Sequence, residues 1–231
     1  MKNTTVYLFM FLFFLIGCNS NMEKDVDSKQ NNKNELKLPQ EIVNNKTSNY
    51  PYEYKEINFQ KIGLLELNEM AVRLLEHSKI ESIQQVKDSL LGLTIIVSDK
   101  IIERDSGYIY AYINKSIAYS EMKRYESAIE VLIELKKQKP VYPDATFRLG
   151  IISEKTGNDS SANSYYNKAF IEYQDYSKSP NATAVDDINF EFLYLLLYGK
   201  AKAINRLDEK LISYPNNPTY LMLKKSFQEF N

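Results

Sequence analysis

The fold is decided by two consecutive stretches of the chain. Residues 108–142 read YIYAYINKSIAYSEMKRYESAIEVLIELKKQKPVY, and residues 143–174 read PDATFRLGIISEKTGNDSSANSYYNKAFIEYQ. Each stretch has two helical patterns of apolar residues around a short polar turn. One constant offset along the chain pairs Ser116 with Gly150, Ala128 with Ala162, and Leu132 with Tyr166. A fixed step of this size is typical of helical repeat arrays, in which each helix pair buries its apolar face against its neighbours.

These residues resemble the tetratricopeptide repeat (TPR). That family has a large residue and a leucine–glycine pair on the first helix, a small residue and an aromatic or leucine on the second, and a closing proline. The unit 109–142 fills these places with Tyr112, Ser116, Tyr119, Ala128, Leu132 and Pro140, although Lys115 stands where leucine is expected. The unit 143–176 fills them with Leu149, Gly150, Ala162, Tyr166 and Ala169. The resemblance implies an all-α fold of stacked helical hairpins, an α-solenoid.

Outside these two units the match to the repeat is weaker. A third unit fits at 184–217, with Glu191 in the place of the glycine, and residues 218–231 read as a helix that caps the array. Before them, residues 57–108 form a degenerate unit with helical patterns at about 57–76 and 80–104. The sequence therefore predicts one helical repeat domain over residues 53–231.

Small residues at characteristic positions of the repeat predict where helices approach each other closely. Gly150 and Ala162 would let two helix backbones come together, while an aromatic ring fills the groove beside them. We therefore assign a packing role to six residues: Ser116, Ala128, Leu149, Gly150, Ala162 and Ala203.

The resemblance also implies a binding surface, because in the TPR family the first helix of each unit lines a concave groove. By register, the residues that face it are Tyr110, Ile113, Ile117, Glu121, Phe147, Ile151, Glu154, Ile188 and Phe192. Such a groove is more apolar than charged and suits an amphipathic helix or an extended apolar segment of a protein partner. The alternative is that a short array fills its own groove. Residues 190–199, FEFLYLLLYG, favour that alternative for Leu195 and Leu196, because a helix that is apolar nearly all round is usually buried.

The N-terminus carries a targeting signal. An uncharged run, residues 6–16, follows a positive start, and in a helix it spans only about 16 Å, too short to cross a bilayer. The tetrapeptide Leu15-Ile16-Gly17-Cys18 resembles the bacterial lipobox. The resemblance implies that residues 1–17 are a signal peptide, that it is removed before Cys18, and that Cys18 is lipidated. The alternative is an ordinary signal peptide with a chance cysteine.

The segment after Cys18 is predicted to be a flexible tether. Residues 18–52 are rich in Asn, Lys, Ser and Asp and have few apolar side chains, so they bury too little surface to offset the entropy of ordering. With the lipid anchor, this predicts a protein of the cell envelope that contacts the membrane through Cys18. In a Gram-negative bacterium we expect the outer membrane, with the repeat domain facing the periplasm or the cell surface.

Composition argues against several other functions. The formal net charge is −1, so nucleic acid is not an expected partner. With Cys18 lipidated, no free thiol remains, and the single histidine, His77, cannot build a zinc site without further ligands. No phosphate-binding glycine loop or nucleophile elbow is present. We expect neither a metal nor another cofactor, and no enzymatic activity.

The predicted function is therefore a membrane-anchored scaffold or adaptor that binds other proteins. One version is an assembly subunit of an envelope complex, and another is an adaptor that neutralises a toxin. An enzyme with an unfamiliar site and a solute-binding lipoprotein are the competing classes. A cleft with several perturbed carboxylates would favour the enzyme, and a closed pocket between two lobes would favour the solute-binding protein.

Overall fold

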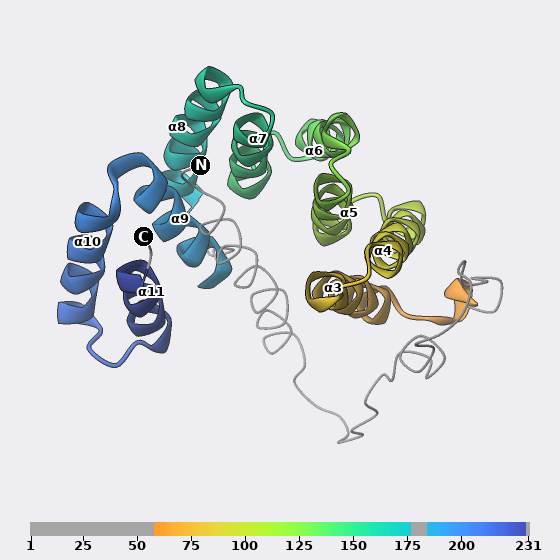
Figure 1. The fold of residues 1–231 in the computed structure, drawn as a ribbon, viewed down its shortest axis with the longest axis horizontal. Coiled ribbons are helices and arrows are strands. Elements are labelled where there is room, and N and C mark those ends of the chain that lie inside the picture. The colour runs from red at the N-terminus through yellow and green to blue at the C-terminus, as the bar shows by residue number, and fades with distance from the viewer. Residues whose placement is uncertain (1–57, 177–183, 230–231) are drawn as a thin grey trace. The chain divides into compact units, whose positions relative to one another are not determined.

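A computed structural model describes residues 58–176 and 184–229, and every regular element in these residues is a helix (Figure 1). The fold class expected from the sequence, an all-α array of helical hairpins, is confirmed for this part of the chain. The predicted signal peptide, Cys18 and the tether lie outside the described residues. None of the described helices combines the length and the hydropathy that a bilayer crossing demands.

The contacts of the described residues divide them into two compact units, 58–138 and 139–229. The first unit has a short 3₁₀ turn followed by two hairpins: η3 (Phe59–Lys61), α3 (Leu64–Ile80), α4 (Gln84–Arg104), α5 (Ile109–Glu121) and α6 (Tyr125–Gln138). Helix α3 starts later than the expected residue 57, because Ile62 and Gly63 adopt extended backbone before it. Arg104 holds this lead-in segment through its Nη1, which donates to the carbonyl oxygens of Phe59 at 3.3 Å and Ile62 at 2.6 Å.

The second unit has five described helices: α7 (Pro143–Lys155), α8 (Asp159–Tyr176), α9 (Ala184–Tyr198), α10 (Lys200–Ser213) and α11 (Pro218–Glu229). Its core is formed by the buried side chains of all five helices, among them Phe147, Tyr173, Leu193, Leu207 and Phe227. Helix α11 buries Leu223 and Phe227, while Leu221, Lys225 and Gln228 are exposed. A terminal helix with one apolar and one mainly polar face is what the end of a repeat array requires.

The helices repeat at the step that the sequence predicts. Helix α5 begins at Ile109 and α7 at Pro143, and the same offset separates the starts of α6 and α8, at Tyr125 and Asp159. The turn inside each hairpin repeats as well. Lys123 has a φ of 59°, and Gly157, one repeat step later, has a φ of 77°. Both turns therefore need a left-handed residue, although only one of them has glycine there.

The residues assigned to close helix packing lie in the interior. Ser116, Ala128, Leu149, Ala162 and Ala203 are all buried. A Cβ atom built on Gly150 would lie 2.5 Å from the ring atoms Cδ1 and Cε1 of Tyr166. No side chain tolerates that distance, so α7 and α8 approach each other at a point where only glycine fits.

Candidate functional site

Five of the nine residues predicted to line the concave groove are buried. Ile113, Ile117, Phe147, Ile188 and Phe192 are at most 6 % exposed. Phe147 belongs to the core of the second unit, where its ring centroid lies 5.8 Å from that of Tyr166. A buried side chain cannot contact a partner without a change in the fold, so these five positions do not fit the partner-facing role expected for them.

The other four residues reach the surface. Tyr110 on α5 is 36 % exposed, and its ring meets Tyr108 edge to face with the centroids 6.1 Å apart. Glu121, at the other end of α5, lies with its Oε2 3.9 Å from Lys87 Nζ. These two residues belong to the unit 58–138 and are its accessible part of the predicted groove.

In the unit 139–229 the accessible residues are Ile151 and Glu154 on α7. Both side chains are half-buried. Glu154 Oε2 accepts a hydrogen bond of 2.6 Å from the Tyr166 hydroxyl, which fixes the carboxylate beside the α7–α8 contact. The accessible part of the groove in this unit thus combines an aliphatic side chain with a positioned acceptor.

Helix α9 packs most of its apolar side chains into the core of the second unit. Leu195 is 4 % exposed, and Leu196 is half-buried and packs against the core of the second unit. The alternative left open by the sequence, that this part of the array packs against itself, describes α9 well. Its apolar residues are therefore structural in the conformation seen here.

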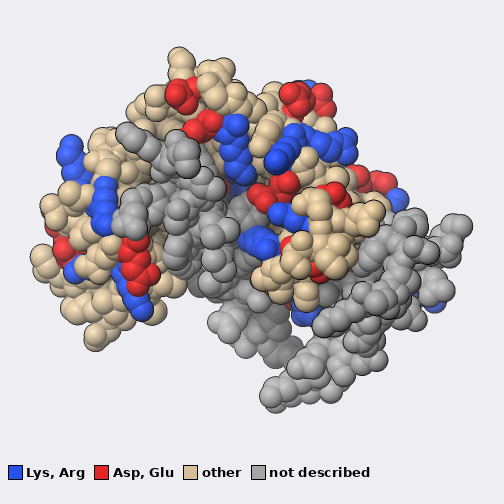
Figure 2. Space-filling model, viewed as in Figure 1, with Lys and Arg blue, Asp and Glu red and all other residues tan. Residues whose placement is uncertain are grey.

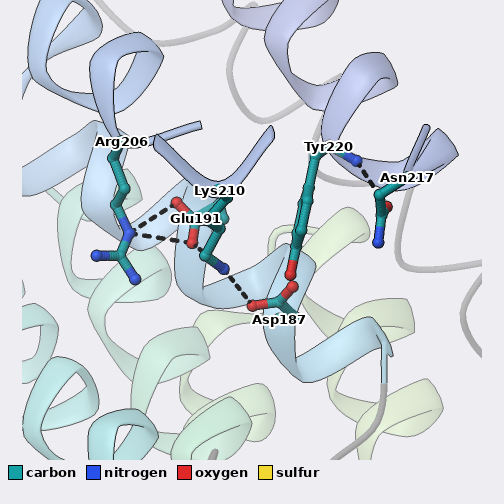
Figure 3. Close-up of polar contacts among 6 residues, drawn as sticks. All are labelled: Asp187, Glu191, Arg206, Lys210, Asn217 and Tyr220. Carbon is teal, nitrogen blue, oxygen red and sulfur yellow. Dashed lines mark hydrogen bonds and ion pairs between the residues drawn. The ribbon is translucent and has the colours of Figure 1, made fainter. Parts of the chain in front are cut away.

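Ion pairs connect α9 with α10, and Tyr220 of α11 lies next to them (Figure 3). Glu191 on α9 is completely buried and occupies the position where the unit before it has Gly150. Its oxygens lie 3.1 and 3.0 Å from Nε of Arg206, and Oε1 lies 2.7 Å from Nζ of Lys210. Lys210 Nζ also donates to Asp187 Oδ1 at 2.7 Å. We call the five residues Asp187, Glu191, Arg206, Lys210 and Tyr220 the Glu191 network.

The electrostatics of this network follow from burial and opposite charge. Burial lowers the pKa of Lys210, but the nearby carboxylates of Glu191 and Asp187 outweigh it, so the pKa lies above its usual value. The Lys210 ammonium also lies 4.7 Å from the ring centroid of Tyr220. Burial, followed by the hydrogen bond to Asp187, raises the pKa of the Tyr220 hydroxyl. At neutral pH Lys210 is therefore positive and Tyr220 neutral.

The sequence shows that Glu191 departs from the repeat pattern. It does not by itself show which side chains neutralise the Glu191 carboxylate. Arg206 and Lys210 stand at positions i and i+4, which puts them on one face of α10. That spacing is the signal that could have found them. A similar pairing occurs in the first unit, where Lys115 replaces the expected leucine and its Nζ lies 2.6 Å from Asp99 Oδ1 on α4.

Aromatic rings gather on α8 and α9 next to this network. Phe170 lies with its ring centroid 5.1 Å from Phe190 and 5.6 Å from Tyr198, and Tyr194 and Tyr198 are 4.5 Å apart. The guanidinium of Arg206 lies 5.0 Å from the Phe190 ring and 4.9 Å from the Tyr194 ring, a favourable cation–π position. Only Tyr198 among the four rings is well exposed, at 41 %.

A second buried polar group joins α7, α8 and α9. Asp144 Oδ2 accepts a 3.1 Å hydrogen bond from Arg148 Nε, and both side chains are almost completely buried. Burial raises the pKa of Asp144, and the positive charge of Arg148 only partly offsets this. Thr146 Oγ1 donates to Glu172 Oε2 at 2.5 Å. The Asp144–Arg148 bond lies within α7, whereas the Thr146–Glu172 bond ties α7 to α8. Asn189 on α9 donates from Nδ2 to Asp144 Oδ1 at 3.5 Å.

No cluster of three potential metal ligands occurs among residues 58–176 and 184–229, and His77 is exposed near the end of α3. Figure 2 shows positive and negative side chains interspersed among the described residues on the visible face.

No protein-family model matches the sequence, and no curated protein matches it. Among solved structures the chain is similar to "YrrB: a TPR protein with an unusual peptide-binding site", with 18 % sequence identity and a TM-score of 0.30. The match covers 68 % of this chain and 99 % of that one. A likeness at this score carries no argument about function, and the peptide-binding site is a property of YrrB.

Proposed function

We propose that this chain is a non-catalytic adaptor that binds protein partners and is held at the envelope membrane by a lipid on Cys18. The observation that carries the proposal is the accessible part of the predicted binding surface in each unit, taken by itself. Tyr110 in one unit and Ile151 in the other lie on the first helix of a hairpin and keep part of their apolar surface exposed. Paired helices that present such side chains are a common platform for amphipathic or extended segments of other proteins.

The partner's chemistry follows from these side chains. Apolar residues would contact Tyr110 and Ile151, and hydrogen-bond donors or cations would meet the half-buried carboxylates of Glu121 and Glu154. Both carboxylates already have a partner in the chain, Lys87 and Tyr166, which holds them in position. An assembly subunit of an envelope complex and a toxin-neutralising adaptor are the two roles that fit such a surface.

The membrane anchor rests on the sequence. The uncharged run 6–16 ends at Leu15-Ile16-Gly17-Cys18, which resembles a lipobox, and a polar segment separates Cys18 from the first described helix. Two or three acyl chains on one cysteine would make the attachment effectively permanent. We place the protein in the cell envelope, on the outer membrane of a Gram-negative cell, with its repeat units in the periplasm or at the surface.

Site-specific photocrosslinking in intact envelopes tests the binding surface. A benzophenone amino acid replaces Tyr110 or Ile151 in the full chain, and the control is the same replacement at Ile133, which is 45 % exposed on α6. We expect a discrete crosslinked protein at position 110, at position 151, or at both, that is absent at 133. The single variants Tyr110→Ala and Ile151→Ala should each lose the partner captured at their own position in a matched pull-down. Identical products at all three positions would overturn the assignment of the surface.

A further inference from the structure

The C-terminal hairpin, α10 with α11, is held to the rest of its unit differently from the other hairpins. Helices α7 and α8 meet at Gly150, whereas α9 carries the large residue Glu191 at the corresponding position and α10 approaches it less closely. Only Ala203 and Leu207 are buried on α10. The ion pairs from Glu191 to Arg206 and Lys210 therefore connect α9 and α10 in addition to this small apolar contact.

Separate contacts hold the two helices of this hairpin to each other. Lys224 Nζ on α11 lies 2.5 Å from Asp208 Oδ1 on α10, and Lys200 Nζ donates to the carbonyl oxygen of Gln228 at 2.7 Å. Neither contact involves α9. The hairpin can therefore keep its own pairing if its contacts with α9 are broken.

A single residue connects α9 to α10. Gly199 lies between Tyr198, the last residue of α9, and Lys200, the first residue of α10, and its φ is +84°. A glycine in this conformation is free of the steric limits that stiffen other residues. It is the joint about which the hairpin can swing without a change inside either helix.

Beside the Glu191 network, the surface of α9 beneath the hairpin has an apolar part. Phe192 on α9 meets Phe227 of α11 edge to face at 5.2 Å, and both side chains are buried. On its other side α9 is held by α8, where Phe190 packs against Phe170 and Tyr173. Removal of the hairpin would uncover one side of α9 and leave its contacts with α8 in place.

We propose that α10 and α11 form a cover that opens as one body about Gly199 and uncovers the apolar side of α9, and that the Glu191 network keeps it closed. The ion pairs suit this role because a buried charge group is strongly sensitive to the loss of one partner. Neutralising Glu191 removes the carboxylate that pairs with Arg206 and leaves Lys210 with Asp187 alone. Loss of the Glu191 charge should therefore weaken the attachment of both α10 and α11 to α9. The proposal concerns a motion of the fold and does not depend on the proposed adaptor function.

Hydrogen exchange of the full-length protein, read peptide by peptide, tests this. In the wild type, α10 and α11 should exchange together and faster than α7 and α8, which is the signature of sub-global opening. The isosteric Glu191→Gln variant should raise their exchange by about a hundredfold, since breaking a buried pair is strongly destabilising. Exchange in α7 and α8 should stay within about threefold.

Two further variants separate the ion network from general damage. Glu209→Gln removes an exposed carboxylate from the same helix and should leave exchange unchanged. The triple variant Glu191→Leu, Arg206→Met, Lys210→Leu replaces the charges with apolar side chains and should restore slow exchange in α10 and α11.

The proposal is overturned if α7 to α11 exchange at one common rate in the wild type, because the unit then opens only as a whole. It is also overturned if Glu191→Gln leaves α10 and α11 unchanged. Should that variant fail to fold, wild-type exchange in low concentrations of urea decides the question. A separate opening of α10 and α11 supports the cover, and a single shared transition rejects it.

Discussion

At the scale of single residues, positions where the chain departs from an ideal repeat explain more than positions that match it. Lys115 and Glu191 both place a charge where the repeat pattern has an apolar or small residue, and each is neutralised from the neighbouring helix, by Asp99 and by Arg206 with Lys210. Glu191 is completely buried, and a lone buried charge costs several kcal/mol, so its partners have to be present for the fold to tolerate this departure.

Gly150 gives the first prediction at this scale. Gly150→Leu should destabilise the protein by about 1–3 kcal/mol through overpacking, because even a Cβ would lie 2.5 Å from the Tyr166 ring. The control is Gly92→Ala in the interior of α4, where an added Cβ has nothing within 4 Å. That change should stabilise the protein by about 0.5–1 kcal/mol through helix propensity. Urea unfolding measures both, and equal effects of the two variants would contradict the close approach of α7 and α8.

The matched turns at Lys123 and Gly157 give a second prediction. Lys123 has a φ of 59°, in the left-handed region that costs a non-glycine residue about 1 kcal/mol or more. Lys123→Gly should therefore raise the free energy of unfolding by roughly 0.5–1 kcal/mol. The reverse change, Gly157→Ala, should lower it by a similar amount, although no atom lies within 4 Å of the added Cβ. Thermal unfolding of both variants should show melting temperatures that move in opposite directions.

At the scale of helices, charged and polar contacts inside the second unit decide how neighbouring elements are held. Asp144 and Arg148 lie on one face of α7, and Asn189 on α9 approaches Asp144 with its Nδ2 3.5 Å from Oδ1. Burial of the carboxylate is the larger effect and raises its pKa above 3.8. Because burial disfavours the ionised Asp144 carboxylate, the free energy of unfolding should depend on pH.

The sign of this dependence is opposite to that of a surface aspartate. A raised pKa in the folded state means that folding favours the protonated form, so ionised Asp144 lowers stability at neutral pH. The penalty should disappear as the pH falls through the folded pKa towards 3.8. We expect the stability of the wild type, relative to Asp144→Asn, to be greater at pH 3.8 than at pH 7. Urea titrations of both proteins at the two pH values measure this, and a constant difference would refute it.

At the scale of the whole molecule, the proposed lipid anchor on Cys18 gives a prediction about location. Cys18→Ser should prevent lipidation and release the protein from the membrane fraction. Labelling of cells with an alkyne fatty acid should mark the wild type and leave the variant unlabelled. If the variant remains in the membrane fraction, another segment or a partner holds the protein there. If the wild type takes up no label, Cys18 is not the lipid-attachment residue.

Much of the helical organisation was predictable from local sequence. The constant repeat step, the alternation of apolar positions and the turns at Lys123 and Gly157 are short-range features, and they predict where α5 to α8 begin. The same holds for α9 and α11, which begin at Ala184 and Pro218. Helix formation depends on neighbours within one or two turns, so the linear order of residues carries that information.

The accessible surface was not predictable in the same way. Register put Ile113, Phe147 and Phe192 in a groove, but all three are buried, because exposure depends on which other elements cover a face. The ion pairs of Glu191 with Arg206 and Lys210 were likewise not predictable from local sequence, because the partners lie on a different helix. Local sequence determines which segments are helical and where they turn, whereas packing across helices decides which side chains stay exposed and which buried charges find partners.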